Sequence, residues 1–185
     1  MTYSFSTNWF KISEIKKNIL NIVDTTHSHN ILEIGSFEGA SACFFSDNLL
    51  ETSDSTLTCV DPFDVQDETT SLTQTTKSVF YENIKKSKNY DKIKVIELYS
   101  KNFYKINTKK YDIIYIDGSH LLKDITIDFI NCLNIIEDNG IIWMDDYLGG
   151  NGETMKEHIN NLYIQHKHNL KLIHIGYEFA FQKIK

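Results

Sequence analysis

Residues 31–45 read ILEIGSFEGASACFF, a short apolar run that ends at Gly35 and continues through a second glycine, Gly39, into small and aromatic residues. The run is rich in Ile and Leu and does not alternate strictly with polar residues, which is typical of a parallel strand buried on both faces. Two glycines with three residues between them permit a tight turn and bring a ligand close to bare backbone. The stretch therefore predicts a buried strand, a ligand-binding turn and a helix over residues 42–50.

Four further apolar runs of the same kind follow along the chain. The five predicted core strands are 31–35, 57–61, 93–98, 111–117 and 140–145. Apolar residues at helical spacing lie before and between these runs, and alternating strands and helices form right-handed crossovers. The tail adds a helix over 153–166 and two strands, 170–175 and 178–184, which we expect to pair antiparallel at one sheet edge. The predicted fold class is α/β: a Rossmann-like, doubly wound, mostly parallel seven-stranded sheet with helices on both faces.

The length of 185 residues predicts a single domain over residues 1–185, because one hydrophobic core of this size buries most of the surface of the chain. Within it we expect an N-terminal helical segment over 1–28, a functional core over 30–147, and a C-terminal helix and strand pair over 152–185. The polar stretch 64–77, rich in Thr, Ser, Gln and Asp, is predicted to form a mobile flap beside the binding edge.

The composition and net charge of the chain indicate which kinds of binding partner are expected and which are not. The 19 basic residues are all lysines and face 25 acidic residues, which gives a net charge of −6. No chain-wide positive field exists to hold a phosphate backbone, so we expect no nucleic-acid partner. The cysteines Cys43, Cys59 and Cys132 each lie inside an apolar run, which predicts buried reduced thiols and a cytoplasmic protein. No signal-like N-terminus and no long apolar run occur, so we expect no membrane partner.

Ligands of a doubly wound sheet bind at the carboxyl ends of its strands, where Glu33 and Asp61 are placed. Asp61 ends the second strand and could accept both hydroxyls of a ribose; alternatively it only opens the turn before Pro62. The third glycine of the dinucleotide motif is missing, and Glu33 would repel a pyrophosphate. A carboxylate there suits a cationic ligand, such as the ammonium group of an amino acid attached to a nucleoside. The alternative is a solvated residue in a plain strand-to-helix turn.

Together these residues resemble a known family. Glu-x-Gly-x-x-x-Gly after one strand and Asp after the next resemble the class I S-adenosylmethionine-dependent methyltransferases. The stretches YDIIYIDGSH (111–120) and GIIWMDDY (140–147) resemble the fourth and fifth strand ends of the metal-dependent small-molecule O-methyltransferases. The pattern is most similar to the macrolide-sugar and cephalosporin-hydroxylase-like branch. The resemblance covers about residues 30–147 and implies the methyltransferase fold.

The resemblance implies S-adenosylmethionine as the cofactor and a Mg²⁺ ion or similar divalent cation. The implied cofactor-binding residues are Glu33, Gly35, Ser36, Glu38, Gly39, Ser41, Asp61, Ser100 and Asp117. The implied metal ligands are Asp117, Asp145 and Asp146. Carboxylate oxygens suit Mg²⁺, which keeps open positions that two vicinal substrate hydroxyls could fill. Adjacent carboxylates repel unless a cation or proton lies between them; alternatively, one of the two faces solvent as a turn residue.

The resemblance also implies catalytic roles for Asp117 and His120. The macrolide-sugar branch carries a histidine where this chain has His120, and an imidazole with a pKa near neutrality could take the proton of the substrate. The alternatives are a helix-capping position after Ser119 or a contact with adenine.

We therefore expect methyl transfer from S-adenosylmethionine to a hydroxyl of a small polar acceptor, a sugar or a catechol-like diol, with help from a metal. One alternative keeps the fold and the metal but not methylation, as in the hydroxylase-named branch. Another is a cofactor-binding accessory protein without turnover. Relatives carry longer N-terminal extensions than this chain. We therefore expect the acceptor site either to be open or to be completed by a second subunit of a homo-oligomer. Aromatic residues before the first helix could form one wall of the site. Those aromatic residues are Tyr3, Phe5, Trp9 and Phe10.

Overall fold

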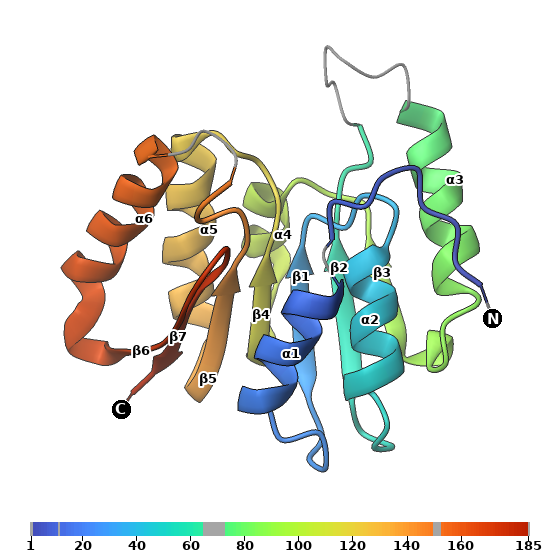
Figure 1. Ribbon diagram of the computed structural model, residues 1–185, viewed down its shortest axis with the longest axis horizontal. Helices are drawn as coiled ribbons and strands as arrows, with labels where there is room; N and C mark the ends of the chain where they lie inside the picture. Colours follow the sequence, from blue (N-terminus) through green and yellow to red (C-terminus); the bar gives the residue numbers. More distant parts are fainter. Residues whose placement is uncertain (1, 11, 65–72, 150–152, 185) are drawn as a thin grey trace.

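Five parallel strands and a C-terminal antiparallel hairpin form one sheet in the order β3-β2-β1-β4-β5-β7-β6 (Figure 1). The computed structural model describes residues 2–10, 12–64, 73–149 and 153–184. The strands are β1 (Asn30–Ile34), β2 (Thr56–Val60), β3 (Ile93–Ile96), β4 (Tyr111–Ile116), β5 (Ile136–Met144), β6 (Leu170–Ile175) and β7 (Phe179–Lys183). The α-helices are α1 (Ile12–Ile22), α2 (Ala40–Leu49), α3 (Thr73–Ile84), α4 (Ser100–Ile106), α5 (Leu122–Ile135) and α6 (Glu153–His166). The predicted fold class is confirmed.

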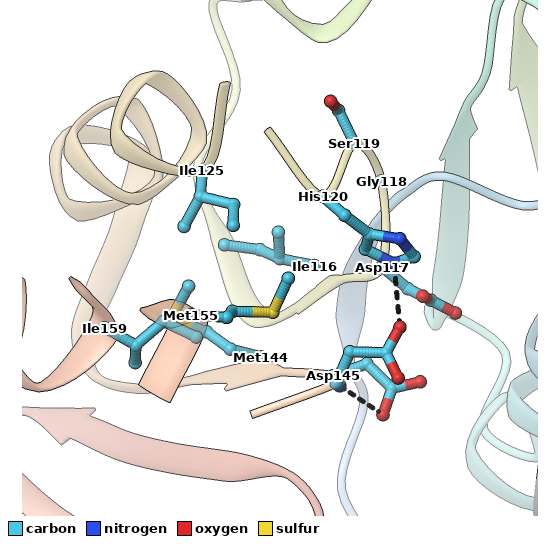
Figure 2. Close-up of a pocket in the computed structure, with 11 residues that line it drawn as sticks. Ile116, Asp117, Gly118, Ser119, His120, Ile125, Met144, Asp145, Met155 and Ile159 are labelled. Atoms are coloured by element: carbon cyan, nitrogen blue, oxygen red, sulfur yellow. Dashed lines mark hydrogen bonds and ion pairs between the residues drawn. The ribbon is translucent and has the colours of Figure 1, made fainter. Parts of the chain in front are cut away.

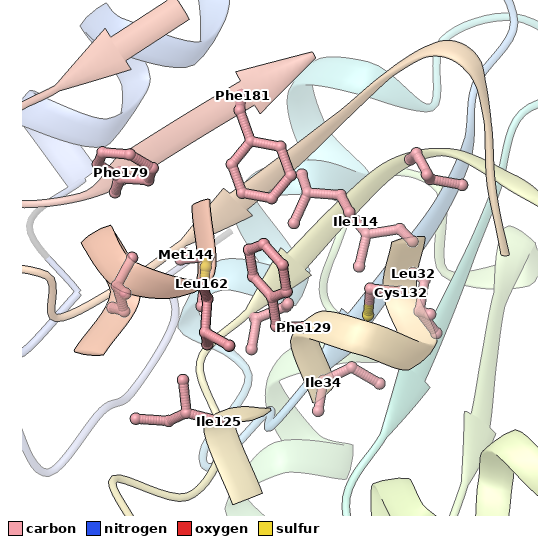
Figure 3. Packing of buried hydrophobic residues seen from close by; sticks show 14 of the residues in the cluster. Leu32, Ile34, Ile114, Ile125, Phe129, Cys132, Met144, Leu162, Phe179 and Phe181 are labelled. Atoms are coloured by element: carbon pink, nitrogen blue, oxygen red, sulfur yellow. The ribbon is translucent and has the colours of Figure 1, made fainter. Parts of the chain in front are cut away.

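Alternation along each strand divides the core into two clusters, one on each face of the sheet. In β4, Ile113 and Tyr115 belong to the cluster that contains buried residues of α1, α2 and α3. Ile114 and Ile116 belong to the cluster that contains residues of α4, α5 and α6, shown in Figure 3. Each fully buried aliphatic or aromatic side chain stabilises the fold by roughly 1.5–3 kcal/mol. Because the strands carry apolar residues on both faces, helices must cover both faces of the sheet to bury them.

The tail forms the predicted antiparallel strand pair at one edge of the sheet, and the structure adds the order of the two strands. The two C-terminal strands do pair antiparallel, but β7 inserts between β5 and β6 and pairs antiparallel with β5. The edge strand is therefore β6, and the turn between β6 and β7 lies at the carboxyl end of β5, where Met144 pairs with Phe179. Buried phenylalanines explain this order, because Phe179 and Phe181 of β7 join the cluster beneath α5 and α6.

Part of the predicted flap is helical. Residues 65–72 lie outside the described residues, and α3 begins at Thr73 within the stretch 64–77. The N-terminal segment contains α1, as expected, together with an extended stretch before it. All three cysteines are buried and free. No helix in the described ranges is long and apolar enough to span a bilayer.

The contact between the turn after β1 and the end of β4 generates a prediction for stability. Gly35 has a φ of +84°, and a Cβ there would clash with the carbonyl oxygen of Asp117 and lie 2.7 Å from the Cα of Gly118. Gly35→Ala should therefore lower the free energy of unfolding by about 2–5 kcal/mol, measured by urea denaturation.

Gly118→Ala is the matched control, because the nearest atom to its added Cβ is a side-chain carbon of Ile34 at 3.5 Å. We expect a change below about 1 kcal/mol. Equal losses in the two variants would contradict the close approach of Gly35 to the β4 backbone.

Candidate active site

The residues that follow four neighbouring strands are aligned along the carboxyl edge of the sheet. Each donates its backbone N–H to the last carbonyl of the next strand, so the ladder continues one residue beyond the strands. These bonds are Asp61 N to Ile96 O (3.2 Å), Gly35 N to Val60 O (2.9 Å), Asp117 N to Ile34 O (2.8 Å) and Asp145 N to Ile116 O (2.9 Å). Because the strand order is β3-β2-β1-β4-β5, this row brings Asp61, Gly35, Asp117 and Asp145 to one edge of the sheet.

Asp61 holds the glycine turn in place. One of its carboxylate oxygens accepts the backbone N–H groups of Ser36 (2.7 Å) and Phe37 (3.0 Å), and the other accepts that of Phe63 (2.7 Å). Phe37 and Phe63 both have positive φ angles, a strained conformation for bulky residues that such hydrogen bonds stabilise. The carboxylate that was predicted to bind a ribose thus also shapes the turn, and its ribose role stays a prediction.

Glu33 is fully buried beneath the same turn. The hydroxyl of Ser36 donates to Oε2, whereas Oε1 forms no hydrogen bond within the described part of the chain. Burial raises the pKa of Glu33 to about 7, because a charged carboxylate loses its hydration there. A buried acid with an unsatisfied acceptor can be completed by a ligand that brings a positively charged donor.

Glu38 anchors the N-terminal strap, a name we give to residues 2–10. Its two carboxylate oxygens accept the backbone N–H (2.6 Å) and the hydroxyl (2.7 Å) of Ser6. The amide of Asn83 donates to the backbone carbonyls of Ser4 (2.8 Å) and Glu38 (3.0 Å). The Glu38 side chain, predicted to contact the cofactor, is thus occupied by the strap, which runs across the carboxyl edge (Figure 1).

The aromatic residues of the strap do not form one cluster but contact different parts of the site. Trp9 stacks on Phe37 of the glycine turn with ring centroids 5.1 Å apart, and it remains 64% exposed. Phe10 packs edge-on against Tyr115, at 6.4 Å between centroids. The hydroxyl of Tyr115 in turn donates to Asp145 at 2.8 Å, so the strap is in contact with both the turn and the acidic end of β5.

Three acidic residues and one histidine converge where β4 and β5 end. Ligand atoms of Asp117, His120 and Asp146 all lie within 4.8 Å of one another, a spacing that one metal ion can bridge. Nε2 of His120 lies 2.7 Å from Oδ2 of Asp146. Asp145, the third predicted ligand, directs one oxygen to the Tyr115 hydroxyl and the other to the backbone N–H of Asp146. The structure thus brings His120 into the group in which Asp145 was expected.

The pKa values of the three acids at this cluster are shifted in opposite directions, by burial and repulsion on the one hand and by a hydrogen bond on the other. Burial, with added repulsion from Asp145 and Asp146, raises the pKa of Asp117 well above its usual range. Burial also raises the pKa of Asp145 to about 6. The hydrogen bond with His120 lowers the pKa of Asp146, and the same bond raises that of His120. Of the ion pairs in the described ranges, the one at this cluster is formed by His120 and not by a lysine.

A small hollow opens beside the cluster, with about 280 Å³ of space that includes its mouth. Figure 2 shows Asp117, His120 and Asp145 at one side of it and apolar side chains at the other. The apolar lining consists of Ile116, Ile125, Met144, Met155 and Ile159. A ligand seated here would meet polar groups at one end only.

The remaining predicted residues lie nearby. Gly39 precedes α2 with a φ of +83°, and Ser41 is buried in the first turn of that helix. Ser100 begins α4, and its hydroxyl hydrogen-bonds to Asp128, a buried acid of α5 whose pKa burial raises to about 6. Asp128 also accepts the hydroxyl of Tyr104 at 3.1 Å, so this group ties α4 to α5 under the edge.

Sequence reasoning missed two tyrosines that contact the acidic cluster, Tyr115 and Tyr177. Tyr115 lies inside the apolar run of β4, where it is predicted only as a core residue. Tyr177 lies between two tail strands and donates its hydroxyl to Oδ1 of Asp146 at 2.5 Å. Only the insertion of β7 beside β5 brings that turn to the site. The Gly-Tyr-Glu turn between two short strands was the one feature of the sequence that could have pointed to Tyr177.

Comparison with known proteins agrees with this geometry. Residues 32–147, more than half of the chain, match the family described as a methyltransferase domain. The chain belongs to this methyltransferase-domain family, and the predicted resemblance to class I S-adenosylmethionine-dependent methyltransferases is confirmed. A comparison with curated proteins gives no match.

Solved structures of methyltransferases share the fold at low sequence identity. An O-methyltransferase from Bacillus cereus in complex with SAH has a TM-score of 0.66 at 16% identity, covering 100% of this chain and 84% of that one. The O-methyltransferase TomG from Streptomyces achromogenes, in complex with SAM, has a TM-score of 0.66 at 11% identity, covering 92% and 79%. An rRNA methylase from Streptococcus thermophilus has a TM-score of 0.65 at 9% identity, covering 98% and 100%.

The anchor of the strap can be tested with Glu38→Gln. Gln carries no charge, so the two charge-assisted bonds to Ser6 become neutral bonds of roughly half the strength, and the amide nitrogen can bond the Ser6 hydroxyl only by donating to it. We expect faster hydrogen exchange at the Ser6 amide and a loss of about 1–3 kcal/mol in unfolding free energy.

Glu51→Gln is the control for that exchange measurement. Glu51 pairs with Lys88 and its side chain is 45% exposed, so exchange in the strap should not change. If the Ser6 amide exchanges equally fast in Glu38→Gln and in the unmodified protein, the anchor does not exist.

Proposed function

We propose that this protein is an S-adenosylmethionine-dependent methyltransferase that methylates a hydroxyl of a small acceptor with the help of a divalent cation. The observation that carries the proposal is the convergence of Asp117, His120 and Asp146 at strand ends adjoining the glycine turn. The family supports methyl transfer, and the two O-methyltransferase structures with SAH or SAM support the cofactor. To these two inferences we add that the methyl group goes to an oxygen atom and that a metal takes part.

The residues of the glycine turn fit the cofactor. Gly35 lets the turn lie directly against the backbone at the end of β4, and buried Glu33 has an oxygen to which none of the described residues donates and which an ammonium group would satisfy. Bound S-adenosylmethionine would supply a methyl group already activated on a sulfonium centre. The chain then has to bind and orient the acceptor, exclude water and receive one proton.

The acidic cluster fits a divalent cation. Asp117, Asp145 and Asp146 lie close together, and burial together with repulsion from Asp145 and Asp146 raises the pKa of Asp117. A cation there would offset both effects. We assign the cation to Asp117 and Asp146, with Asp145 as the third candidate ligand. A divalent ion there would act as a Lewis acid on an acceptor hydroxyl. Carboxylate oxygens suit Mg²⁺ and Mn²⁺.

His120 is the proposed general base. Its Nε2 faces Asp146, so a neutral ring keeps its proton on Nε2 and leaves the lone pair on Nδ1. Nδ1 is therefore the atom that would receive the hydroxyl proton as the methyl group moves. The side chain is 52% exposed, which leaves it within reach of an acceptor.

A small acceptor with hydroxyls at one end fits better than RNA. The net charge of −6 and the absence of arginine disfavour a polyanionic acceptor. The hollow beside the cluster has its polar groups on one side, where the hydroxyls of a small acceptor could approach the proposed cation. The rRNA methylase shares the fold only, and RNA enters the test as a competing acceptor.

Cofactor binding should release protons because of Glu33. With a pKa of about 7 the buried acid is half protonated at pH 7, and an ammonium group would ionise it and release about half a proton. Titration calorimetry without metal, in buffers of different ionisation enthalpy, measures this number. Glu33→Gln should bind more weakly and lose the release, whereas Glu51→Gln should keep both. Equal buffer dependence in Glu33→Gln and the unmodified protein contradicts the assignment.

Methyl transfer should depend on the cation and on His120. With labelled cofactor and a panel of phenolic diols, sugars and RNA, we expect transfer to a diol or sugar that EDTA abolishes and Mg²⁺ or Mn²⁺ restores. His120→Asn should lower kcat about 10²-fold, and Asp117→Asn should at least match that loss. Transfer that is indifferent to EDTA contradicts the metal. Transfer to RNA contradicts the acceptor class, and cofactor binding without any transfer favours an accessory protein.

A further inference from the structure

Asp146 lies between two side chains from different parts of the chain. Its Oδ2 is 2.7 Å from Nε2 of His120, which follows β4, and its Oδ1 accepts the hydroxyl of Tyr177 at 2.5 Å. Tyr177 lies in the turn between β6 and β7, more than thirty residues further along the chain. The proposed function gives this tyrosine no role.

The local backbone is built around this contact. Asp146 has a φ of +54°, in the left-handed region that Asp adopts more readily than bulkier residues because its short polar side chain can form local hydrogen bonds. A Cβ on Gly149 would clash with the Tyr177 hydroxyl and lie 2.5 Å from Oδ1 of Asp146. The backbone N–H of Leu148 donates to the carbonyl of Tyr177 at 3.1 Å. The left-handed backbone at Asp146, the missing side chain at Gly149 and a backbone hydrogen bond thus all allow the tyrosine to lie over the carboxylate.

A carboxylate on this crowded edge needs such a donor. Asp146 lies beside Asp145 and near Asp117, and both repel it. Without a donor on Oδ1, the carboxylate can rotate about its last bond, and Oδ2 then leaves the position that faces His120. A hydroxyl donor holds one oxygen and so determines where the other one points.

We propose that Tyr177 is a positioning residue, whose hydroxyl fixes the Asp146 carboxylate so that Oδ2 faces His120 and the carboxylate stays close to Asp117. The inference rests on the proposed function, because it assigns Asp146 to the cation and to the orientation of His120. Tyr177 acts through Asp146 and does not itself contact the acceptor. The antiparallel hairpin thus contributes to the site as well as extending the sheet.

Tyr177→Phe tests the proposal, since it removes the hydroxyl and keeps the ring. Mn²⁺ affinity is measured by the electron paramagnetic resonance signal of free Mn²⁺, and cofactor affinity by calorimetry without metal. We expect Mn²⁺ to bind about tenfold more weakly, with unchanged cofactor affinity. Tyr81→Phe is the matched control, because its hydroxyl also donates to a carboxylate, that of Glu97 at 2.9 Å, and its Mn²⁺ affinity should not change.

A second variant and a second measurement allow the proposal to be tested even if Tyr177→Phe folds poorly or the protein binds no metal. Gly149→Ala keeps Tyr177 and Asp146 but forces at least one of the two side chains out of its position, so it should weaken Mn²⁺ binding in the same way. The ¹⁵N shifts of His120 report whether Nε2 carries the proton, and both variants should change them. If the unmodified protein binds no Mn²⁺, the metal in the proposed function is wrong, and the His120 shifts alone decide the role of Tyr177. Unchanged Mn²⁺ affinity and unchanged His120 shifts in Tyr177→Phe overturn the inference.

Discussion

The close approach of the β1 turn to the end of β4 is the contact on which the rest of the site depends. The chain at Gly35 passes so near the carbonyl of Asp117 that a single added carbon has no room. Through this contact the glycine turn and the acidic cluster share one edge without a side chain between them. The backbone bond from Asp117 to Ile34 sets the register of the approach, and Asp61 holds the outer side of the turn.

Electrostatic repulsion is the cost of that arrangement, and the chain offsets it with neutral donors rather than with lysines. Asp61 accepts three backbone N–H groups, and Asp145 and Asp146 each accept a tyrosine hydroxyl. The pKa of Asp117 is raised the furthest of the three acids at the β4 and β5 ends, first by burial and then by repulsion from Asp145 and Asp146. A positively charged ligand there would favour the ionised form of Asp117, because burial weakens the screening by water.

Different physical forces build the two sides of the crevice. On one side, apolar residues of α5 and α6 pack on β4 and β5 and form the wall of the hollow through burial alone. On the other side, hydrogen bonds from Ser6 to Glu38 and ring contacts from Trp9 and Phe10 hold the strap over the turn. A wall made by the core resists opening, whereas a strap held by a few polar bonds can open locally at much lower cost.

The sequence by itself determined the strands, their mostly parallel order and the positions of Gly35, Asp61, Asp117 and Asp145 at strand ends, because apolar runs and turns are local patterns. It did not determine what each side chain faces. Glu38 shares the turn with Gly35 and Gly39 yet binds the strap, and Tyr177 reaches Asp146 only because two phenylalanines draw β7 in beside β5. Contacts of this kind join segments that are far apart in the chain, so they depend on how whole helices and strands pack. No local sequence pattern predicts them.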